Sequence, residues 1–294
     1  EEMLRQMMVA LLAGGHALLE GVPGTAKTLA IRSLSLATDL RFGRVQFTPD
    51  LMPTDLVGVN ILDETRKEFV YHPGPIFADL LLADEINRAP AKTQAALLEA
   101  MQERQVTVDG VSRPLPAGFT VFASQNPVEY EGTYPLPEAQ LDRFLLEIDV
   151  GYPTRDAERR ILIETTGADE HKPLAVMNAE ALMNAQRLVR RLPVGESVVD
   201  AILDLVRSAR PEGDGIDGVT DKILWGPGPR ASQALMLAVR ARALIEGRVA
   251  PSIADVVALA EPVLKHRMAL TFSARADGES IRSVIGRLTS RLAG

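Results

Sequence analysis

The hydrophobic pattern divides the chain into a first half of short apolar runs and a second half of helical stripes. The short runs resemble buried strands of a parallel sheet, which need no polar face. From about residue 151 onward this strand pattern fades, and apolar residues recur with helical spacing instead. The predicted strands are 16–20, 44–47, 80–83, 119–124 and 145–150, and the predicted later helices are 154–165, 178–191, 196–210, 230–246 and 252–263. We therefore expect an α/β part over residues 1–150 and a helical part over residues 151–294.

Helices and hairpins fill the spaces between these strands. Helical spacing predicts a helix over residues 1–14, one from the first loop to about Leu36, and one over 91–103 that opens at a proline. Two pairs of short β segments predict hairpins, 59–62 with 68–71 and 105–108 with 111–113. The excursion over residues 48–75 is irregular for a compact domain, so it is either a plain surface loop or a functional insertion.

A glycine-bearing loop, Gly21-Val22-Pro23-Gly24-Thr25-Ala26-Lys27-Thr28, lies between the first strand and the next helix. Backbone N–H groups of such a loop cradle phosphates, and the following helix N-terminus adds the positive end of its dipole. Lys27 is placed to reach the β- and γ-phosphates, and the Thr28 hydroxyl to bind Mg²⁺. The alternative is a strand-to-helix turn in which Lys-Thr occurs by chance.

Alanine at position 26 departs from the usual phosphate-loop pattern, which has glycine directly before the lysine. A side chain at a positive φ angle is penalised, whereas glycine is not. We therefore expect the backbone of Ala26 to be near-helical.

Two adjacent acids, Asp84 and Glu85, end the apolar run at residues 80–83. Burying an unpaired acid is costly, so packing does not explain them, and ligands bind at the carboxyl ends of parallel strands. Asp84 is placed to hold Mg²⁺, directly or through a water, and Glu85 to activate an attacking water. The alternative is a pair of solvated acids at a helix entry.

Three further polar residues are candidates for the same chemistry. Asn126 follows the strand at 119–124, where an amide can orient a water or touch the γ-phosphate, or can simply begin a turn. Arg143 precedes the last strand, and arginine there either stabilises phosphoryl-transfer charge or forms a surface ion pair. Arg230 lies in the first turn of a helix, where a cation opposes the dipole and needs an anionic partner, either a local acid or a phosphate.

Composition narrows the classes of function. The formal net charge is −7, which argues against a protein wrapped around nucleic acid. The chain has no cysteine, which excludes disulfides and thiolate chemistry, and its four histidines have no metal-ligand spacing. We expect no transmembrane helix, because no apolar run approaches 18 residues, and we find no signal-peptide pattern. The default expectation is a cytoplasmic protein.

These pieces together resemble the AAA+ ATPases, and within them the MoxR family. The resemblance covers nearly the whole chain, and Ala26 before the lysine is typical of MoxR-like proteins. It is carried by residues 19–28, 47–53, 81–90, 124–127, 132–144 and 229–231. The resemblance implies an αβα sandwich with a parallel five-stranded sheet, a helix-2 insert at 48–75 and a pre-sensor-1 hairpin at 105–113, followed by an all-α lid.

The resemblance also implies a role for each candidate. Lys27 and Thr28 resemble the Walker A pair, Asp84 and Glu85 Walker B, and Asn126 sensor 1. Arg143 is similar to an arginine finger presented to the next subunit, Arg230 to sensor 2, and Arg88 is a further candidate for inter-subunit work. The first helix has no capping residue, so we expect the natural sequence to extend before Glu1, and to hold there the residues that recognise the base.

The function that the resemblance implies is Mg²⁺-dependent ATP hydrolysis by a ring, commonly a hexamer, that remodels partner proteins. Such partners often carry a von Willebrand factor A domain. One alternative is a nucleotide-dependent binding switch with little turnover, which the complete set of hydrolytic residues disfavours. A DNA-acting AAA+ motor is a second alternative, which the acidic charge disfavours.

Overall fold

The computed structural model describes residues 1–292 except 23, 66, 127–131, 166–172 and 213–217. The chain divides into two compact units, each built from separate stretches of sequence. We call them the sheet unit, Leu18–Leu136 with Asp149–Met183, and the helical unit, Glu1–Ala17 with Pro137–Ile148 and Asn184–Gly294. These units differ from a single cut at residue 150, because the first helix and the segment after Leu136 belong to the helical unit. The functional boundary at 150 stays a prediction.

A five-stranded sheet forms in the order β2-β5-β8-β1-β9. The pairs β2–β5 and β5–β8 are parallel, and Gln46 of β2 lies opposite Asp84 of β5. Every residue of β5 is buried, which explains why that run is apolar on both faces. The strands are β1 (Ala17–Glu20), β2 (Phe42–Gln46), β5 (Leu80–Asp84), β8 (Thr120–Gln125) and β9 (Leu146–Asp149). All five predicted strands are thus confirmed, with boundaries shifted by at most two residues.

Helices of the sheet unit follow the predicted pattern closely. They are α2 (Lys27–Ala37), α3 (Pro53–Val57), the 3₁₀ turn η1 (Ile86–Arg88), α4 (Ala91–Glu103) and α6 (Arg155–Thr165). Helix α7 (Ala179–Arg191) begins in the sheet unit and continues into the helical unit. The single turn of α3 starts at a proline, and the Asp55 carboxylate accepts a hydrogen bond from the Met52 N–H at 2.8 Å. Within the sheet unit, buried Phe47, Phe119 and Phe122 are among the largest core side chains.

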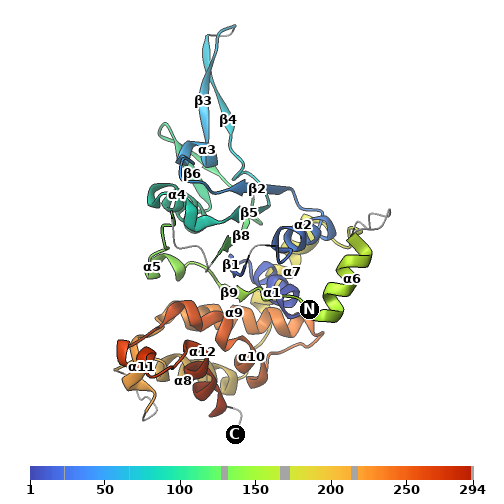
Figure 1. The fold of residues 1–294 in the computed structure, drawn as a ribbon. Coiled ribbons are helices and arrows are strands. Elements are labelled where there is room, and N and C mark those ends of the chain that lie inside the picture. The colour runs from blue at the N-terminus through green and yellow to red at the C-terminus, as the bar shows by residue number, and fades with distance from the viewer. Residues whose placement is uncertain (23, 66, 127–131, 166–172, 213–217, 293–294) are drawn as a thin grey trace. The chain divides into compact units, whose positions relative to one another are not determined.

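Two hairpins extend the sheet unit, β3 (Gly58–Asp63) with β4 (Glu68–Pro73) and β6 (Gln105–Val108) with β7 (Val111–Pro114). Figure 1 shows β3 and β4 as a long ribbon that projects away from the sheet. The Asn60 amide donates to the Asp109 carboxylate at 2.5 Å, and the Arg113 guanidinium lies 3.6 Å from the centre of the Tyr71 ring. Side chains therefore connect the two hairpins.

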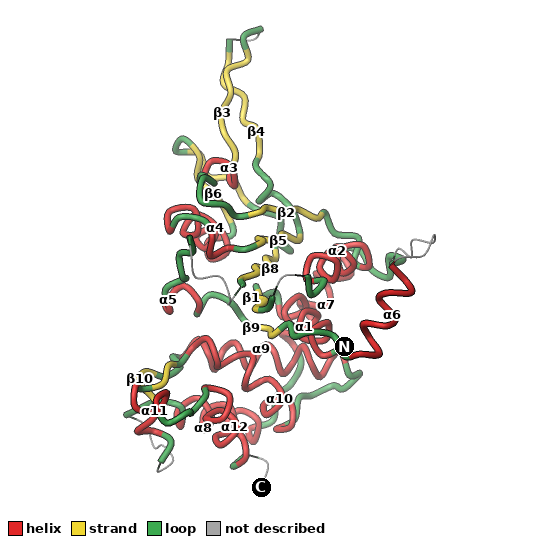
Figure 2. Tube along the Cα trace, in the orientation of Figure 1, coloured by secondary structure: helices red, strands yellow, loops and turns green. Residues whose placement is uncertain are grey.

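The helical unit contains most of the remaining helices, which Figure 2 shows in red. They are α1 (Glu2–Ala13), α5 (Glu138–Leu141), α8 (Glu196–Ser208), α9 (Pro229–Ile245), α10 (Ile253–Leu264), α11 (Phe272–Ala276), α12 (Ile281–Ser290) and the 3₁₀ turns η2 (Thr220–Lys222) and η3 (Lys265–Arg267). Long α9 packs against α1, α8 and α10. A short antiparallel pair, β10 (Ile223–Trp225) with β11 (Ala269–Leu270), was not predicted, so the C-terminal region is helical but not all-α. Among the described helices, none is long and apolar enough to cross a lipid bilayer.

Candidate active site

The glycine-bearing loop joins β1 to α2, as the sequence predicts. Its first residue has no room for a side chain, because a Cβ on Gly21 would lie 2.4 Å from the carbonyl oxygen of Val150. The Gly21 N–H donates to the carbonyl of Gln125 at 3.3 Å, and the Thr25 hydroxyl donates to the carbonyl of Val22 at 2.9 Å. The first contact fixes the start of the loop, and the second closes a turn within it. Pro23, which the sequence also assigns to it, lies outside the described residues.

The backbone of Ala26 corrects one expectation. Its φ and ψ angles are 61° and 22°, which is the left-handed region and not a near-helical conformation. The residue caps α2 from this conformation, and a non-glycine residue there costs about 1–2 kcal/mol. The loop thus keeps a geometry that suits glycine although the sequence supplies alanine.

The Lys27 ammonium group folds back over the loop. It donates to the carbonyl of Gly21 at 2.5 Å and to that of Val22 at 3.5 Å. Burial lowers the pKa of Lys27 below its ordinary value, while the charges of Asp84, Glu85 and Glu20 act in the opposite direction. The lysine and the two acids therefore share one electrostatic environment in the sheet unit.

Asp84 is held on both of its carboxylate oxygens. The Ser124 hydroxyl donates to Oδ1 at 2.6 Å, and the Arg44 guanidinium donates to Oδ2 at 2.8 Å. The residue is only 9% exposed, so these partners offset the cost of burying its charge. Strands β2 and β8 flank β5 and supply both donors, which fixes the carboxylate at the sheet edge.

Glu85 adopts a strained backbone conformation directly after β5, with φ of 57°. Its N–H donates to the Ser124 hydroxyl at 2.9 Å. Its Oε2 atom accepts from the Gln46 amide at 2.8 Å and from the Arg88 guanidinium at 2.9 Å. Strain of this kind occurs at functional sites, where the surroundings must enforce it. Arg88 is therefore a direct neighbour of Glu85.

Asn126 lies one residue beyond β8 and is 5% exposed. The strands β5 and β8 are neighbours, so Asn126 follows the carboxyl end of a strand next to the one that carries the acids. Within the sheet unit the structure thus brings together the phosphate loop, the two acids and the sensor-like amide. Thr28, in the first turn of α2, completes the predicted set in this unit.

Arg143 and Arg230 belong to the helical unit, where both lie beside Asp142. Arg143 directly follows Asp142 and is half-buried. The Arg230 guanidinium lies 3.7 Å from Asp142 Oδ2, with 54% of its side chain exposed. The predicted anionic partner of Arg230 is therefore a local acid in this structure.

Buried Arg267 of η3 is a partner of this segment that the sequence reasoning missed. Its Nε donates to Asp142 Oδ1 at 2.8 Å, and its terminal nitrogens donate to the carbonyls of Asp142, Phe144, Leu145 and Val263. Burial lowers its pKa, and Asp142 counteracts that effect. Gln46, Arg44 and Ser124 were missed as well. Their positions in the sequence could have identified them, because each lies near the carboxyl end of a strand that flanks β5.

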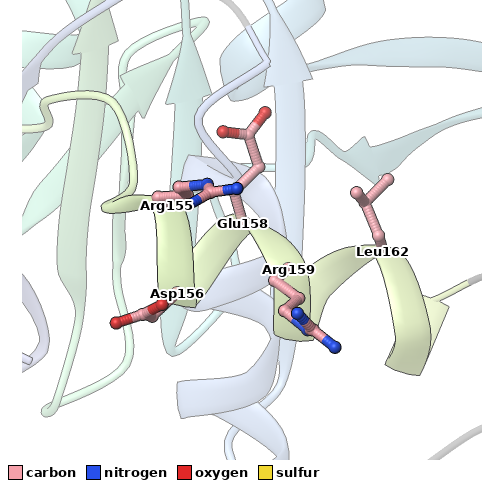
Figure 3. A pocket seen from close by; sticks show the side chains of 5 residues that line it. All are labelled: Arg155, Asp156, Glu158, Arg159 and Leu162. Carbon is pink, nitrogen blue, oxygen red and sulfur yellow. The ribbon is translucent and has the colours of Figure 1, made fainter.

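A separate hollow of about 320 Å³ lies on α6 and is lined by Arg155, Asp156, Glu158, Arg159 and Leu162. Figure 3 shows Glu158 and Leu162 projecting from the same side of this helix. None of its lining residues belongs to the predicted site. The hollow therefore shares no described residue with the predicted site.

Comparison with known proteins agrees with this geometry. The family described as "ATPase family associated with various cellular activities (AAA)" matches residues 16–146, and the AAA lid domain matches residues 219–288. Chaperone MoxR1 of Mycobacterium tuberculosis is 44% identical over all of this chain and 78% of its own length. Protein MoxR of Paracoccus denitrificans is 32% identical over 91% of this chain and 84% of its own length.

A solved structure from Cytophaga hutchinsonii, described as a candidate ATPase, has the same fold. It superposes with a TM-score of 0.92 at 38% identity, over 98% of this chain and 88% of that one. The α/β part with its five-stranded sheet and the helical C-terminal region are those of the AAA+ architecture. On the phosphate loop, the paired acids and these full-length similarities, the chain belongs to the MoxR family of AAA+ ATPases.

Proposed function

We propose that this chain binds Mg·ATP, hydrolyses it, and works as a ring-forming, chaperone-like motor that remodels or activates partner proteins. The observation that carries the proposal is the shared environment of Lys27, Asp84 and Glu85 at the carboxyl edge of the sheet. A phosphate cradle, a metal-ligand acid and a candidate base there are the parts that phosphoryl transfer to water requires.

Lys27 is the residue that meets the phosphates. Its ammonium group is now satisfied by carbonyls of its own loop. Exchanging these neutral acceptors for β- and γ-phosphate oxygens gives stronger, charge-assisted hydrogen bonds. The N–H groups of residues 21–28 supply further donors, and the N-terminus of α2 adds a favourable field.

The donor set at the strand ends suits Mg²⁺, which prefers hard oxygen ligands and retains several waters. The Thr28 hydroxyl and the Asp84 carboxylate would hold it, Asp84 directly or through a water. Ser124 and Arg44 keep that carboxylate in place. When bound, the ion neutralises charge that develops on the phosphate oxygens.

Glu85 is the general base that takes a proton from the attacking water, and Asn126 orients that water or the γ-phosphate. The Glu85 Oε2 atom already accepts from Gln46 and Arg88, which leaves Oε1 for the water. General-base catalysis contributes about 10²–10⁴-fold to rate. Glu85 therefore governs turnover more than nucleotide affinity.

Arg143 acts as the arginine finger for a nucleotide on the neighbouring subunit, and Arg230 contacts phosphate as sensor 2. An arginine supplied in this way stabilises the charge of the transition state. The ring is hexameric, the protein is cytoplasmic, and one class of partner carries a von Willebrand factor A domain. The relative named Chaperone MoxR1 supports the chaperone-like part of the proposal.

The decisive experiment compares Glu85→Gln, Lys27→Ala and the unmodified chain for ATP binding and Mg²⁺-dependent phosphate release. Glu85→Gln is expected to bind ATP while turnover falls about 10²–10⁴-fold. Lys27→Ala is expected to lose affinity for ATP. Glu99→Gln, an exposed acid on α4, serves as the matched control and should change neither quantity. Retained turnover in Glu85→Gln would reject Glu85 as the base.

Two other outcomes separate the alternatives. A binding switch would show partner binding that depends on nucleotide, with negligible phosphate release by the unmodified chain. A DNA motor would show DNA binding that weakens steeply with salt, because protein–phosphate contacts release counterions. Sedimentation with and without ATP tests ring assembly.

A further inference from the structure

The buried guanidinium of Arg267 forms several hydrogen bonds to the segment Asp142–Leu145. Arg267, 3% exposed, donates to both the side chain and the carbonyl of Asp142. It also donates to the carbonyl of Phe144 at 2.5 Å and to that of Leu145 at 3.2 Å. Three of the four peptide carbonyls in this segment are thus fixed by one side chain.

The other two residues of η3 strengthen the same attachment. The His266 ring nitrogen Nε2 lies 3.1 Å from the carbonyl oxygen of Phe144, and the Lys265 ammonium lies 3.3 Å from the Glu147 carboxylate. Burial lowers the pKa of His266 well below its ordinary value, so the ring is neutral and donates through Nε2–H. Every residue of this short turn therefore contacts the stretch around Arg143.

Arg143 lies in the middle of the segment Asp142–Leu145. Its own N–H donates to the carbonyl of Gln140 at 3.2 Å, so its backbone is fixed on both sides. Among the described residues, its guanidinium has no hydrogen-bond or ion-pair partner. The direction in which this side chain leaves the surface is thus set by the backbone that Arg267 holds.

We propose that Arg267 is a positioning residue that aims Arg143 for its contact with nucleotide, an inference that rests on the proposed role of Arg143. A buried ion pair is often no more stabilising than apolar residues of similar volume, and in some proteins its role is to specify one geometry. Small misplacements of a catalytic group cost large factors in rate.

A double-mutant cycle tests this. Arg267→Lys keeps the charge but loses the planar fork that reaches several acceptors at once. With the full chain, it is expected to lower kcat for ATP by about tenfold with KM changed less than about twofold. In the Arg143→Ala background, Arg267→Lys is expected to lower kcat no further, because the contact that Arg267 positions is already absent. Arg287→Lys, an arginine paired with Glu279, is the matched control and should leave kcat unchanged.

Other results would overturn the proposal. Losses in kcat that multiply in the double variant assign Arg267 to general stability. The same conclusion follows if Arg267→Lys and Arg267→Gln both fail to fold by circular dichroism. If Arg143→Ala leaves kcat unchanged, Arg143 does not contribute to turnover and the inference about Arg267 fails. A loss of turnover in Glu85→Gln would still support ATP hydrolysis in that case.

Mixed assemblies provide an independent readout. Glu85→Gln chains lack the base but carry an intact Arg143, whereas Arg267→Lys chains carry an intact base. Mixing the two is expected to restore turnover above the average of the separate samples, if the defect of Arg267→Lys lies in the contact with a neighbour. Mixing that restores nothing would contradict the inference.

Discussion

The Gln46 amide donates to Glu85 Oε2 at 2.8 Å, from the strand next to the one that Glu85 follows. Gln46 lies opposite Asp84 in the parallel register, so its side chain reaches the residue after its backbone partner. The Arg88 guanidinium donates to the same Oε2 atom. Two donors on one oxygen restrict the rotation of the carboxylate and leave its other oxygen for water.

We predict that Gln46→Ala lowers kcat for ATP roughly tenfold and leaves KM nearly unchanged, because the base loses one of its two anchors. Steady-state phosphate release over a range of ATP concentrations measures both quantities. Gln102→Ala, an exposed glutamine on α4, is the control. An unchanged kcat would mean that Arg88 alone suffices to orient Glu85.

The strained backbone at position 26 gives a prediction of the opposite sign. Ala26→Gly removes a left-handed alanine, so it is expected to stabilise the protein by about 1 kcal/mol and to leave turnover within about twofold. Thermal unfolding without nucleotide measures the shift. Ala26→Val should destabilise the protein, since a β-branched residue tolerates positive φ poorly. A lower melting temperature for Ala26→Gly would show that alanine is favoured by contacts of its methyl group.

Much of this fold could be predicted from the sequence because its pattern is local. Helix α4 falls on the predicted residues, and the Asp109–Gly110 turn has the positive φ angles that its sequence predicts. Helix α12 and the β10–β11 pair, in contrast, were not predicted. Strands β10 and β11 pair residues that are more than 40 positions apart, and segments this short carry no repeating pattern of their own.

The candidate site likewise contains residues whose places could be predicted from the sequence and residues whose places could not. Lys27, Asp84 and Glu85 could be predicted because motif and strand position coincide. The donors that hold the acids come from neighbouring strands, and only the sheet order brings Gln46 and Ser124 to them. Arg267 could not be predicted at all, since it contacts Asp142 across 125 positions of sequence. The conformation of Ala26 was predicted wrongly, because the loop around it overrides the preference of alanine.

The two hairpins of the sheet unit are expected to respond together to one substitution. The Arg113 guanidinium stacks on Tyr71, and a cation–π contact of this kind contributes about 0.5–1 kcal/mol. We predict that Arg113→Ala increases amide hydrogen exchange in both β3–β4 and β6–β7, while exchange in β5 stays unchanged. Arg44 is unsuitable as a control because it binds Asp84, so Arg32→Ala, on α2, is used instead. Faster exchange confined to β6–β7 would show that the hairpins are independent.

Buried His266 gives a prediction about pH. Burial and the charges of Arg267 and Lys265 lower its pKa in the folded protein, against the hydrogen bond to Phe144. Between that lowered value and the ordinary pKa of about 6.5, the unfolded chain binds a proton that the folded chain does not. The contribution of His266 to stability is therefore complete above about pH 6.5 and is lost as the pH falls below it.

We accordingly predict that the melting temperature of the unmodified chain falls between pH 7 and pH 5, and falls less in His266→Gln. The glutamine amide can still donate to the carbonyl of Phe144 but does not titrate, so it removes the proton linkage while keeping the contact. The slope that one such histidine adds is at most about 1.4 kcal/mol per pH unit. His72→Gln, on the exposed β4 strand, is the control and should retain the full slope of the unmodified chain. Identical slopes in all three chains would mean that His266 binds its proton over the same pH range in the folded and the unfolded chain. Burial and the charges of Arg267 and Lys265 oppose that outcome, whereas the Glu147 carboxylate, 3.8 Å from His266 Nδ1, favours it.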